Sequence, residues 1–220
     1  MVARDAKTYA VAALALAAIA GAGVAGAQSG APTVGASASP STFASPSSSA
    51  SASPTASPPT ASSDASAAAF LDIARVLQSP RCLNCHPVGD APLNGDRGAR
   101  HRMNVSRRSP SVGLGCTTCH RGTNGRTLHS PPGVLPAWRM PPTEHPMVFQ
   151  GKTPRALCEG LKDPAQNGGK SLAALREHSA HDPLVLWGWH PGPGRTTPPL
   201  SHEDFVARVD TWIAGGATCP

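Results

Sequence analysis

The same five-residue pattern, Cys-x-x-Cys-His, occurs twice in this chain, at residues 82–86 and 116–120. Each copy brings two thiols next to an imidazole, so each copy is equipped to hold the same kind of group. The second copy follows the first too closely for each to belong to a domain of ordinary size. One fold must therefore accommodate both motifs and whatever they bind.

C-x-x-C-H is the attachment signature of c-type haem, in which two thiols add to the vinyl groups of the haem and the histidine binds the iron. We therefore expect two covalently attached haem c groups in this chain. The expected thioether residues are Cys82, Cys85, Cys116 and Cys119. The expected proximal iron ligands are His86 and His120.

Paired C-x-x-C motifs have two other uses, a four-thiolate zinc site and a pair of disulfides. The segment between the two cysteine pairs is longer than in typical zinc ribbons. A histidine directly after both pairs would also be coincidental in either alternative. Haem attachment is the interpretation that uses all the motif residues.

The N-terminus has the features of an export signal. Arg4 and Lys7 precede an apolar run over residues 9–20, and an Ala-x-Ala site ends at Ala27. This order predicts a secretory signal peptide at residues 1–27 and a periplasmic location. The alternative is an uncleaved membrane anchor, since residues 9–27 approach spanning length, and only then would we expect membrane contact.

Residues 28–65 consist almost entirely of Ala, Ser, Pro and Thr. Such a segment buries too little apolar surface to offset its ordering entropy, so we expect a disordered linker. The folded domain is then residues 66–220. The whole chain has only 4% aromatic residues, with 24 Pro and 22 Gly, so we expect a small core, and two macrocycles would add the apolar surface that the sequence lacks.

Helix signals surround the motifs, and no strand pattern of useful length occurs. Phe70, Ile73 and Leu77 recur at helical spacing, and Ser or Thr followed by Pro or acidic residues marks later helix starts. We expect helices at about 66–78, 153–162 and 201–214, and one that starts near residue 170. Residues 87–115 and 121–150 are punctuated by Pro and Gly, which indicates loops. The predicted fold is an all-α, compact, cytochrome c-like dihaem domain with long haem-wrapping loops.

Two cysteines lie outside the motifs, Cys158 and Cys219. In an exported protein such a pair usually forms a disulfide. An apolar insert at residues 184–189 contains two of the four tryptophans. We favour core packing for this insert over a redox or docking role.

An iron that transfers electrons takes His or Met as its second axial ligand, and this chain offers many of both. His178 continues the spacing of Leu172 and Leu175 on a predicted helix, which favours burial near a haem. His101 lies midway between the motifs. Met140 and Met147 flank a Pro-rich loop of the kind that presents an axial methionine in small cytochromes. The distal candidates, in order of preference, are His101, His178, Met147, His202 and Met140.

The formal charge of +6 is concentrated in an arginine-rich stretch over residues 97–139 that contains no Asp or Glu. The stretch lacks the aromatic or motif support that nucleic-acid binding needs, so we expect no nucleic acid partner. It is either a solvated basic face or a group of arginines that pair with haem propionates or steer an acidic redox partner.

At both motifs the chain resembles dihaem c-type cytochromes. Segments 161–164, 167–169, 182–185 and 194–195 are similar to small exported cytochromes associated with molybdenum-dependent aldehyde or isoquinoline-type dehydrogenases. The resemblance implies a periplasmic electron carrier that accepts electrons from such a dehydrogenase and passes them towards a respiratory chain. The alternative is a dihaem peroxidase-type enzyme, in which one iron keeps an open position for peroxide.

Overall fold

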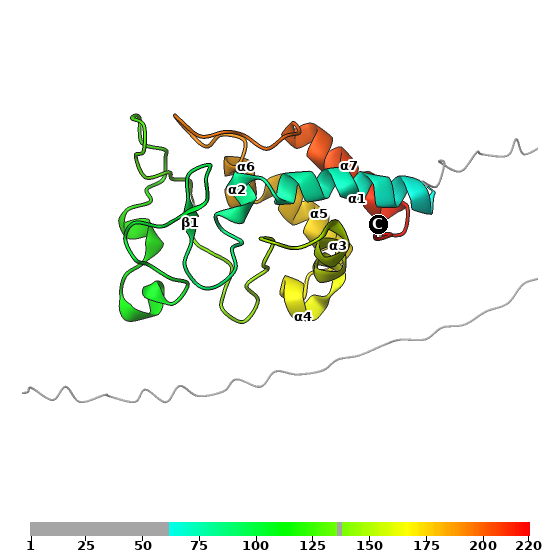
Figure 1. Cartoon of the computed structure of the whole chain (residues 1–220), viewed down its shortest axis with the longest axis horizontal. Helices are drawn as coiled ribbons and strands as arrows, with labels where there is room; N and C mark the ends of the chain where they lie inside the picture. The colour runs from blue at the N-terminus through cyan, green and yellow to red at the C-terminus, as the bar shows by residue number, and fades with distance from the viewer. Residues whose placement is uncertain (1–61, 136–137) are drawn as a thin grey trace, which may run out of the picture. The chain divides into compact units, whose positions relative to one another are not determined.

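The computed structural model describes residues 62–135 and 138–220, which form one compact unit (Figure 1). The predicted signal peptide at 1–27 and most of the predicted linker lie outside these residues. Among the described helices, none has both the length and the hydrophobicity needed to cross a membrane. The elements are α1 (Ser63–Leu77), α2 (Pro80–Leu83), β1 (Leu93–Asn94), β2 (Ala99–Arg100), the 3-10 helices η1 (Ser109–Val112) and η2 (Cys116–Thr118), α3 (Pro154–Lys162), α4 (Pro164–Asn167), α5 (Leu172–His181), α6 (Pro183–Trp187) and α7 (His202–Ala214).

The described part is mostly helical, as the sequence predicts, with one two-stranded antiparallel sheet. This sheet pairs Leu93 with Arg100 and Asn94 with Ala99. Its strands are too short to show an alternating pattern, which is why the sequence gives no sign of them. The sheet and the 3-10 helix η1 interrupt the predicted loop at residues 87–115, whereas the described part of 121–150 contains no helix or strand, as expected.

Hydroxyl side chains start the main helices. Ser62 accepts a hydrogen bond from the amide of Ala65, so α1 begins at Ser63. Residues 63–65, predicted as the end of the linker, are therefore helical, because this cap satisfies a free amide of the first turn. Ser171 and Ser201 cap α5 and α7 in the same way.

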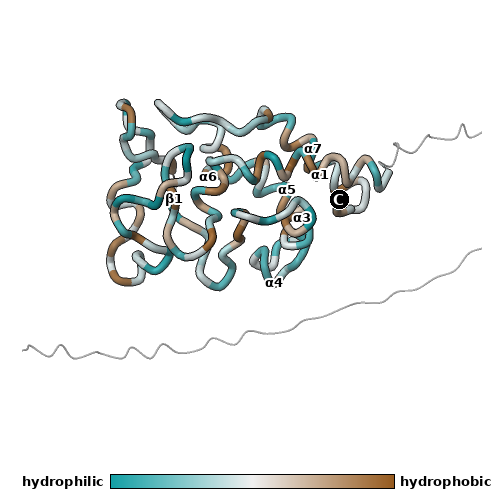
Figure 2. Tube along the Cα trace, in the orientation of Figure 1, coloured by the Kyte–Doolittle hydropathy of each residue, from teal (hydrophilic) through white to brown (hydrophobic). Residues whose placement is uncertain are grey.

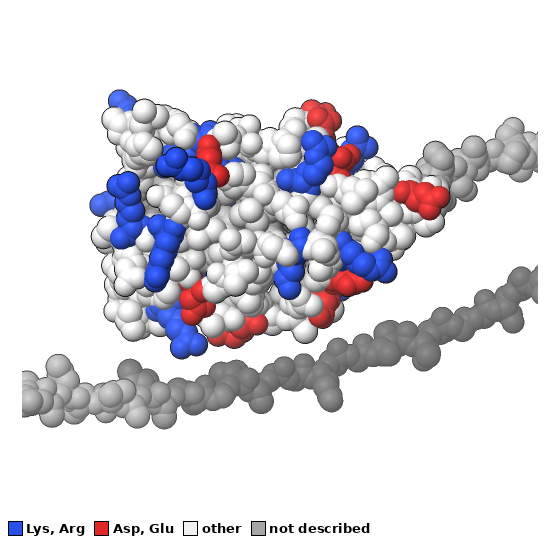
Figure 3. Space-filling model, viewed as in Figure 1, with Lys and Arg blue, Asp and Glu red and all other residues white. Residues whose placement is uncertain are grey.

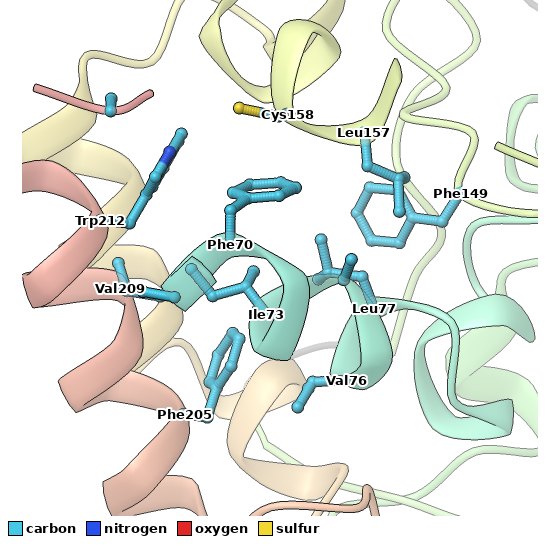
Figure 4. Packing of buried hydrophobic residues seen from close by; sticks show 13 residues of the cluster. Phe70, Ile73, Val76, Leu77, Phe149, Leu157, Cys158, Phe205, Val209 and Trp212 are labelled. Carbon is cyan, nitrogen blue, oxygen red and sulfur yellow. The ribbon is translucent and has the colours of Figure 1, made fainter. Parts of the chain in front are cut away.

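The hydrophobic core lies between α1 and α7, which pack along each other (Figures 1 and 4). Phe70 is fully buried, and its ring centroid lies 5.0 Å from that of Trp212 on α7. Full burial of a large side chain of this kind contributes about 1.5–3 kcal/mol. The predicted inward face of the first helix is confirmed, since Phe70, Ile73, Ala74 and Leu77 are all buried.

A disulfide joins Cys158 on α3 to Cys219 near the C-terminus, which confirms the predicted pair. The bond spans 61 positions of sequence. Closing a loop of that size stabilises a fold by roughly 3–4 kcal/mol in chain-entropy terms. It fastens the C-terminal segment against α3, beside the core shown in Figure 4.

The part that contains the loops differs from the helical part in its apolar surface. Hydrophobic residues there occur in short separate stretches (Figure 2). Several large apolar side chains in this part are exposed: Val88, Met103, Val112, Leu114, Leu128 and Leu135. These residues surround the two motifs along the chain, so the protein presents uncovered apolar surface near the motifs.

Candidate functional site

The first motif follows directly from the core helix. α1 ends at Leu77, and the short helix α2 carries Cys82 at its C-terminal end. The amide of His86 donates to the carbonyl of Cys82, which closes the motif into a turn. Burial raises the pKa of Cys82 and of Cys85 to about 11, so both thiols are protonated at neutral pH.

His86 is positioned by contacts with residues of the core region. Its Nδ1 lies 2.7 Å from the carbonyl oxygen of Met147, and its ring stacks on Phe149 at a centroid distance of 4.0 Å. The bond to a carbonyl places the proton on Nδ1 and leaves Nε2 as the nitrogen that binds metal. Burial lowers the pKa of His86 to about 4, so the ring is neutral at pH 7, the form that a metal ligand needs.

The second motif repeats this geometry on the 3-10 helix η2. The amide of His120 donates to the carbonyl of Cys116. The Nδ1 of His120 lies 2.7 Å from the carbonyl oxygen of Pro132, and its ring stacks on Trp138 at 4.6 Å. Burial lowers the pKa of His120 as well. Both motif histidines therefore direct Nδ1 to a backbone carbonyl and keep Nε2 for a ligand.

The four motif cysteines form no disulfides. Comparison with protein-family models, curated proteins and solved structures finds no match. The residues present nevertheless fit haem c: each motif supplies two free thiols, a neutral imidazole with a fixed tautomer, and exposed apolar side chains nearby. Cys82, Cys85 and His86 would hold one haem, and Cys116, Cys119 and His120 would hold the other.

Helix α6 connects the surroundings of the two motifs. Trp187 packs edge-on against Trp138 at a centroid distance of 4.7 Å, and Trp138 in turn stacks on His120. On its other side, the guanidinium of Arg81 lies 6.0 Å from the ring of Trp187. Arg81 immediately precedes the first motif. The predicted packing role of the 184–189 insert is confirmed for Trp187, which is buried where the two motif regions meet.

Asn124 fastens the loop after the second motif to α6. Its Oδ1 accepts hydrogen bonds from the indole of Trp187 at 2.8 Å and from the amide of Gly133 at 3.1 Å. Its Nδ2 donates to the carbonyl of His190 at 2.7 Å. One side chain therefore joins the loop after the second motif to the segment at Trp187 and His190, and this arrangement supports the Pro132 carbonyl beside His120.

Of the distal candidates, His101 lies beside the second motif. Its ring centroid is 6.0 Å from that of His120. At that distance the two imidazoles would be near enough to hold one metal ion between them. The Nδ1 of His101 accepts a hydrogen bond of 3.3 Å from the amide of Met103, which places the proton of the neutral ring on Nε2. Metal binding through Nε2 would therefore require this proton to move to Nδ1 and the bond to Met103 to break.

His178 lies near the first motif, close enough for its charge to lower the pKa of His86 further. Its Nδ1 is 3.3 Å from the carboxylate of Asp182, so its Nε2 is also free to bind. The predicted burial is wrong in part: Leu175 is buried, but the His178 side chain is 41% exposed. The reason is that the carboxylate draws the ring towards the exposed last turn of α5.

The other distal candidates stand in different places. The backbone carbonyl of Met147 accepts the hydrogen bond from Nδ1 of His86, so Met147 lies on the Nδ1 side of that ring. The Met147 side chain packs against the hydrophobic core. The Nε2 of His202 is 3.0 Å from the carbonyl of Ser179, and its ring packs on Trp189. Met140 lines a cavity of about 210 Å³ beside Cys116.

Several residues around the site gave no sequence signal. Phe149 and Trp138 stack on the two motif histidines, but nothing local in the sequence shows which aromatic ring faces a distant imidazole. The carbonyls of Met147 and Pro132 belong to the backbone and carry no residue-type signal at all. Their position depends on how the loops return to the motifs.

Proposed function

We propose that this chain is an exported electron-transfer protein that carries two covalently bound haem c groups. It accepts electrons from a dehydrogenase, of the molybdenum-dependent type that the resemblance implies, and passes them towards a respiratory chain. One observation carries the proposal: both C-x-x-C-H histidines place Nδ1 2.7 Å from a backbone carbonyl and keep Nε2 free. A histidine fixed in this way is oriented to bind a metal.

When bound, each haem supplies an iron that changes its charge by one electron. The chain's own residues would attach it through the motif thiols, and the half-buried motif histidines, whose pKa values are lowered by desolvation, would be its neutral ligands. The exposed apolar side chains between residues 88 and 135 provide surface for the macrocycles to cover. Such covering would account for the large exposed apolar residues in the loops around the motifs.

The distal positions favour electron transfer over peroxide chemistry. His101 lies 6.0 Å from His120, and His178 lies near His86 with its Nδ1 held by Asp182. We infer that these two histidines complete the coordination of the second and the first haem, respectively. Two irons with histidine on both sides leave no open position for peroxide.

The surface over the loops suits an acidic redox partner. Lys and Arg side chains predominate over this part of the face seen in Figure 3, whereas both signs mix over the helices. Cys119 is exposed, so the second motif reaches the surface where such a partner would dock. A basic surface of this kind raises the rate of encounter with an acidic protein.

The test is the optical spectrum of protein matured with haem, together with a pyridine haemochrome assay that counts haems per chain. We expect two haems with low-spin bands. His178→Ala and His101→Ala should each make one haem high-spin, whereas His181→Ala, an exposed control on the same helix as His178, should leave both low-spin. A wild-type high-spin fraction that binds peroxide would instead support the peroxidase-type enzyme, and the absence of covalent haem would refute both.

A further inference from the structure

Arg107 differs from the other arginines of the basic stretch. Its side chain is 1% exposed, although the residue lies in a loop. The other members of the stretch are exposed at the surface: Arg97, Arg100, Arg102, Arg108, Arg121, Arg126 and Arg139. The stretch is therefore mainly a solvated face with a single buried guanidinium, and a buried cation requires a specific partner.

The hydrogen bonds of Arg107 are incomplete. One terminal nitrogen donates to the carbonyl of Pro141 at 2.8 Å. The Nε and the second terminal nitrogen are buried and have no hydrogen-bond partner. The nearest carboxylate, on Asp90, is 3.9 Å from Nε, which is too far for a hydrogen bond, and it is half exposed. Two nitrogens of the charged guanidinium are thus buried and available to an acceptor.

Arg81 shows how a buried arginine is neutralised in this fold, although its Nε, like that of Arg107, has no hydrogen-bond partner. Its side chain is equally buried, but its guanidinium is paired directly with Asp96. Arg107 lacks such a partner, and burial lowers its pKa. The chain therefore pairs one buried guanidinium directly with its own carboxylate, whereas the other has no carboxylate within hydrogen-bond distance.

Arg107 also lies where a haem-borne group would reach it. It lines the cavity of about 210 Å³ together with Cys116, Trp138 and Met140. Its charge also acts on Cys85 and His86 of the first motif. The guanidinium therefore lies between the two motifs and lines a cavity that also contacts Cys116, an expected haem-attachment residue.

We propose that Arg107 is a carboxylate-binding residue that holds a propionate of the haem attached through Cys116 and Cys119. The inference rests on the proposed function. The planar fork of a guanidinium matches a carboxylate with two parallel hydrogen bonds, and Arg107 has two N–H groups free for them. The bond fixes the orientation of the macrocycle and places a positive charge beside it, which favours the reduced iron.

The experiment compares Arg107→Gln with the wild type in the haem-loaded protein, by resonance Raman spectroscopy and spectroelectrochemistry. We expect two haems per chain, a shifted propionate bending band, and a change of about tenfold in the oxidised-to-reduced ratio of one haem at fixed potential, towards the oxidised form. Arg108→Gln is the matched control, because it removes an exposed charge from the adjacent position. It should move neither the band nor the ratio.

Two further variants distinguish the alternatives. If Arg107 served only to pair with Asp90, Asp90→Asn would change the propionate band as Arg107→Gln does, and the proposal would be wrong. If Arg107→Gln fails to fold, Arg107→Lys keeps the buried charge but loses the fork, so its propionate band must still shift. An unshifted band in a variant with two haems refutes this inference alone, whereas a protein without covalent haem refutes the proposed function.

Discussion

The two C-x-x-C-H motifs share the same backbone hydrogen bonds, but one adjoins the helical core and the other lies among loops. In both, the histidine amide donates to the first cysteine's carbonyl, and Nδ1 lies 2.7 Å from a distant carbonyl. The first motif extends from the core helix α1, and His86 stacks on Phe149 of the core cluster. The second lies among loops and depends on Trp138 and the hydrogen bonds of Asn124. The motif itself determines its turn, whereas its rigidity comes from its neighbours.

This difference assigns unequal roles to the haems that we propose. The helical core is complete without a cofactor, with Phe70 and Trp212 fully packed. The loop-rich part exposes Val112, Leu128 and Leu135, and they lie on either side of the second motif in the sequence. We therefore expect the first haem to dock on a preformed surface and the second to order the loops around it.

The largest expected effect is in the helical core. Phe70→Ala removes a fully buried ring that packs on Trp212, so the free energy of unfolding should fall by about 3–5 kcal/mol. Leu71→Ala is the matched control, because Leu71 is adjacent and 47% exposed, and it should cost under about 1 kcal/mol. Denaturant titration followed by circular dichroism measures both. Equal losses in the two variants would contradict the assignment of the core to α1 and α7.

The next effect tests the comparison directly by removing one haem at a time. Cys116→Ala/Cys119→Ala leaves the loops without the second macrocycle, so proteolysis within residues 97–135 should accelerate by about a hundredfold. Cys82→Ala/Cys85→Ala removes the first haem, but the core remains, so the same loops should be cleaved far more slowly. Limited proteolysis with mass spectrometry identifies the cut sites. Cleavage that begins in α1 or α7 in both variants would show that the two regions do not differ in this way.

Local signals account for what the sequence predicts correctly. The starts of α3 and α7 depend on Thr153 and Ser201, whose side chains bond to amides three residues later, so they are visible within one turn. The disulfide is predicted because only Cys158 and Cys219 remain after the motifs. These features need no knowledge of the distant chain.

The features that the sequence does not predict all depend on long-range packing. Arg107 directly precedes the exposed Arg108 in the sequence, and the return of the loop at Pro141 buries its side chain. His178 is predicted to be buried from its spacing, but the carboxylate of Asp182 holds it at the exposed edge of α5. Residue type and spacing indicate which groups are present, and the fold decides which of them meet.

The smallest expected effect concerns the connection between the two regions. Asn124→Ala removes the hydrogen bonds that join the second-motif loop to Trp187, Gly133 and His190, and it leaves the indole N–H of Trp187 without its acceptor. Loss of a buried partner costs about 1–3 kcal/mol. The loss should be local: amide hydrogen exchange should rise around residues 121–135 and stay unchanged in α1 and α7. Asn94→Ala, at an exposed position of β1, is the control, and it should change neither the stability nor the amide exchange of these regions. Faster exchange throughout the helices would mean that the loops and the core unfold as one unit, and the two motifs would then share a single stability.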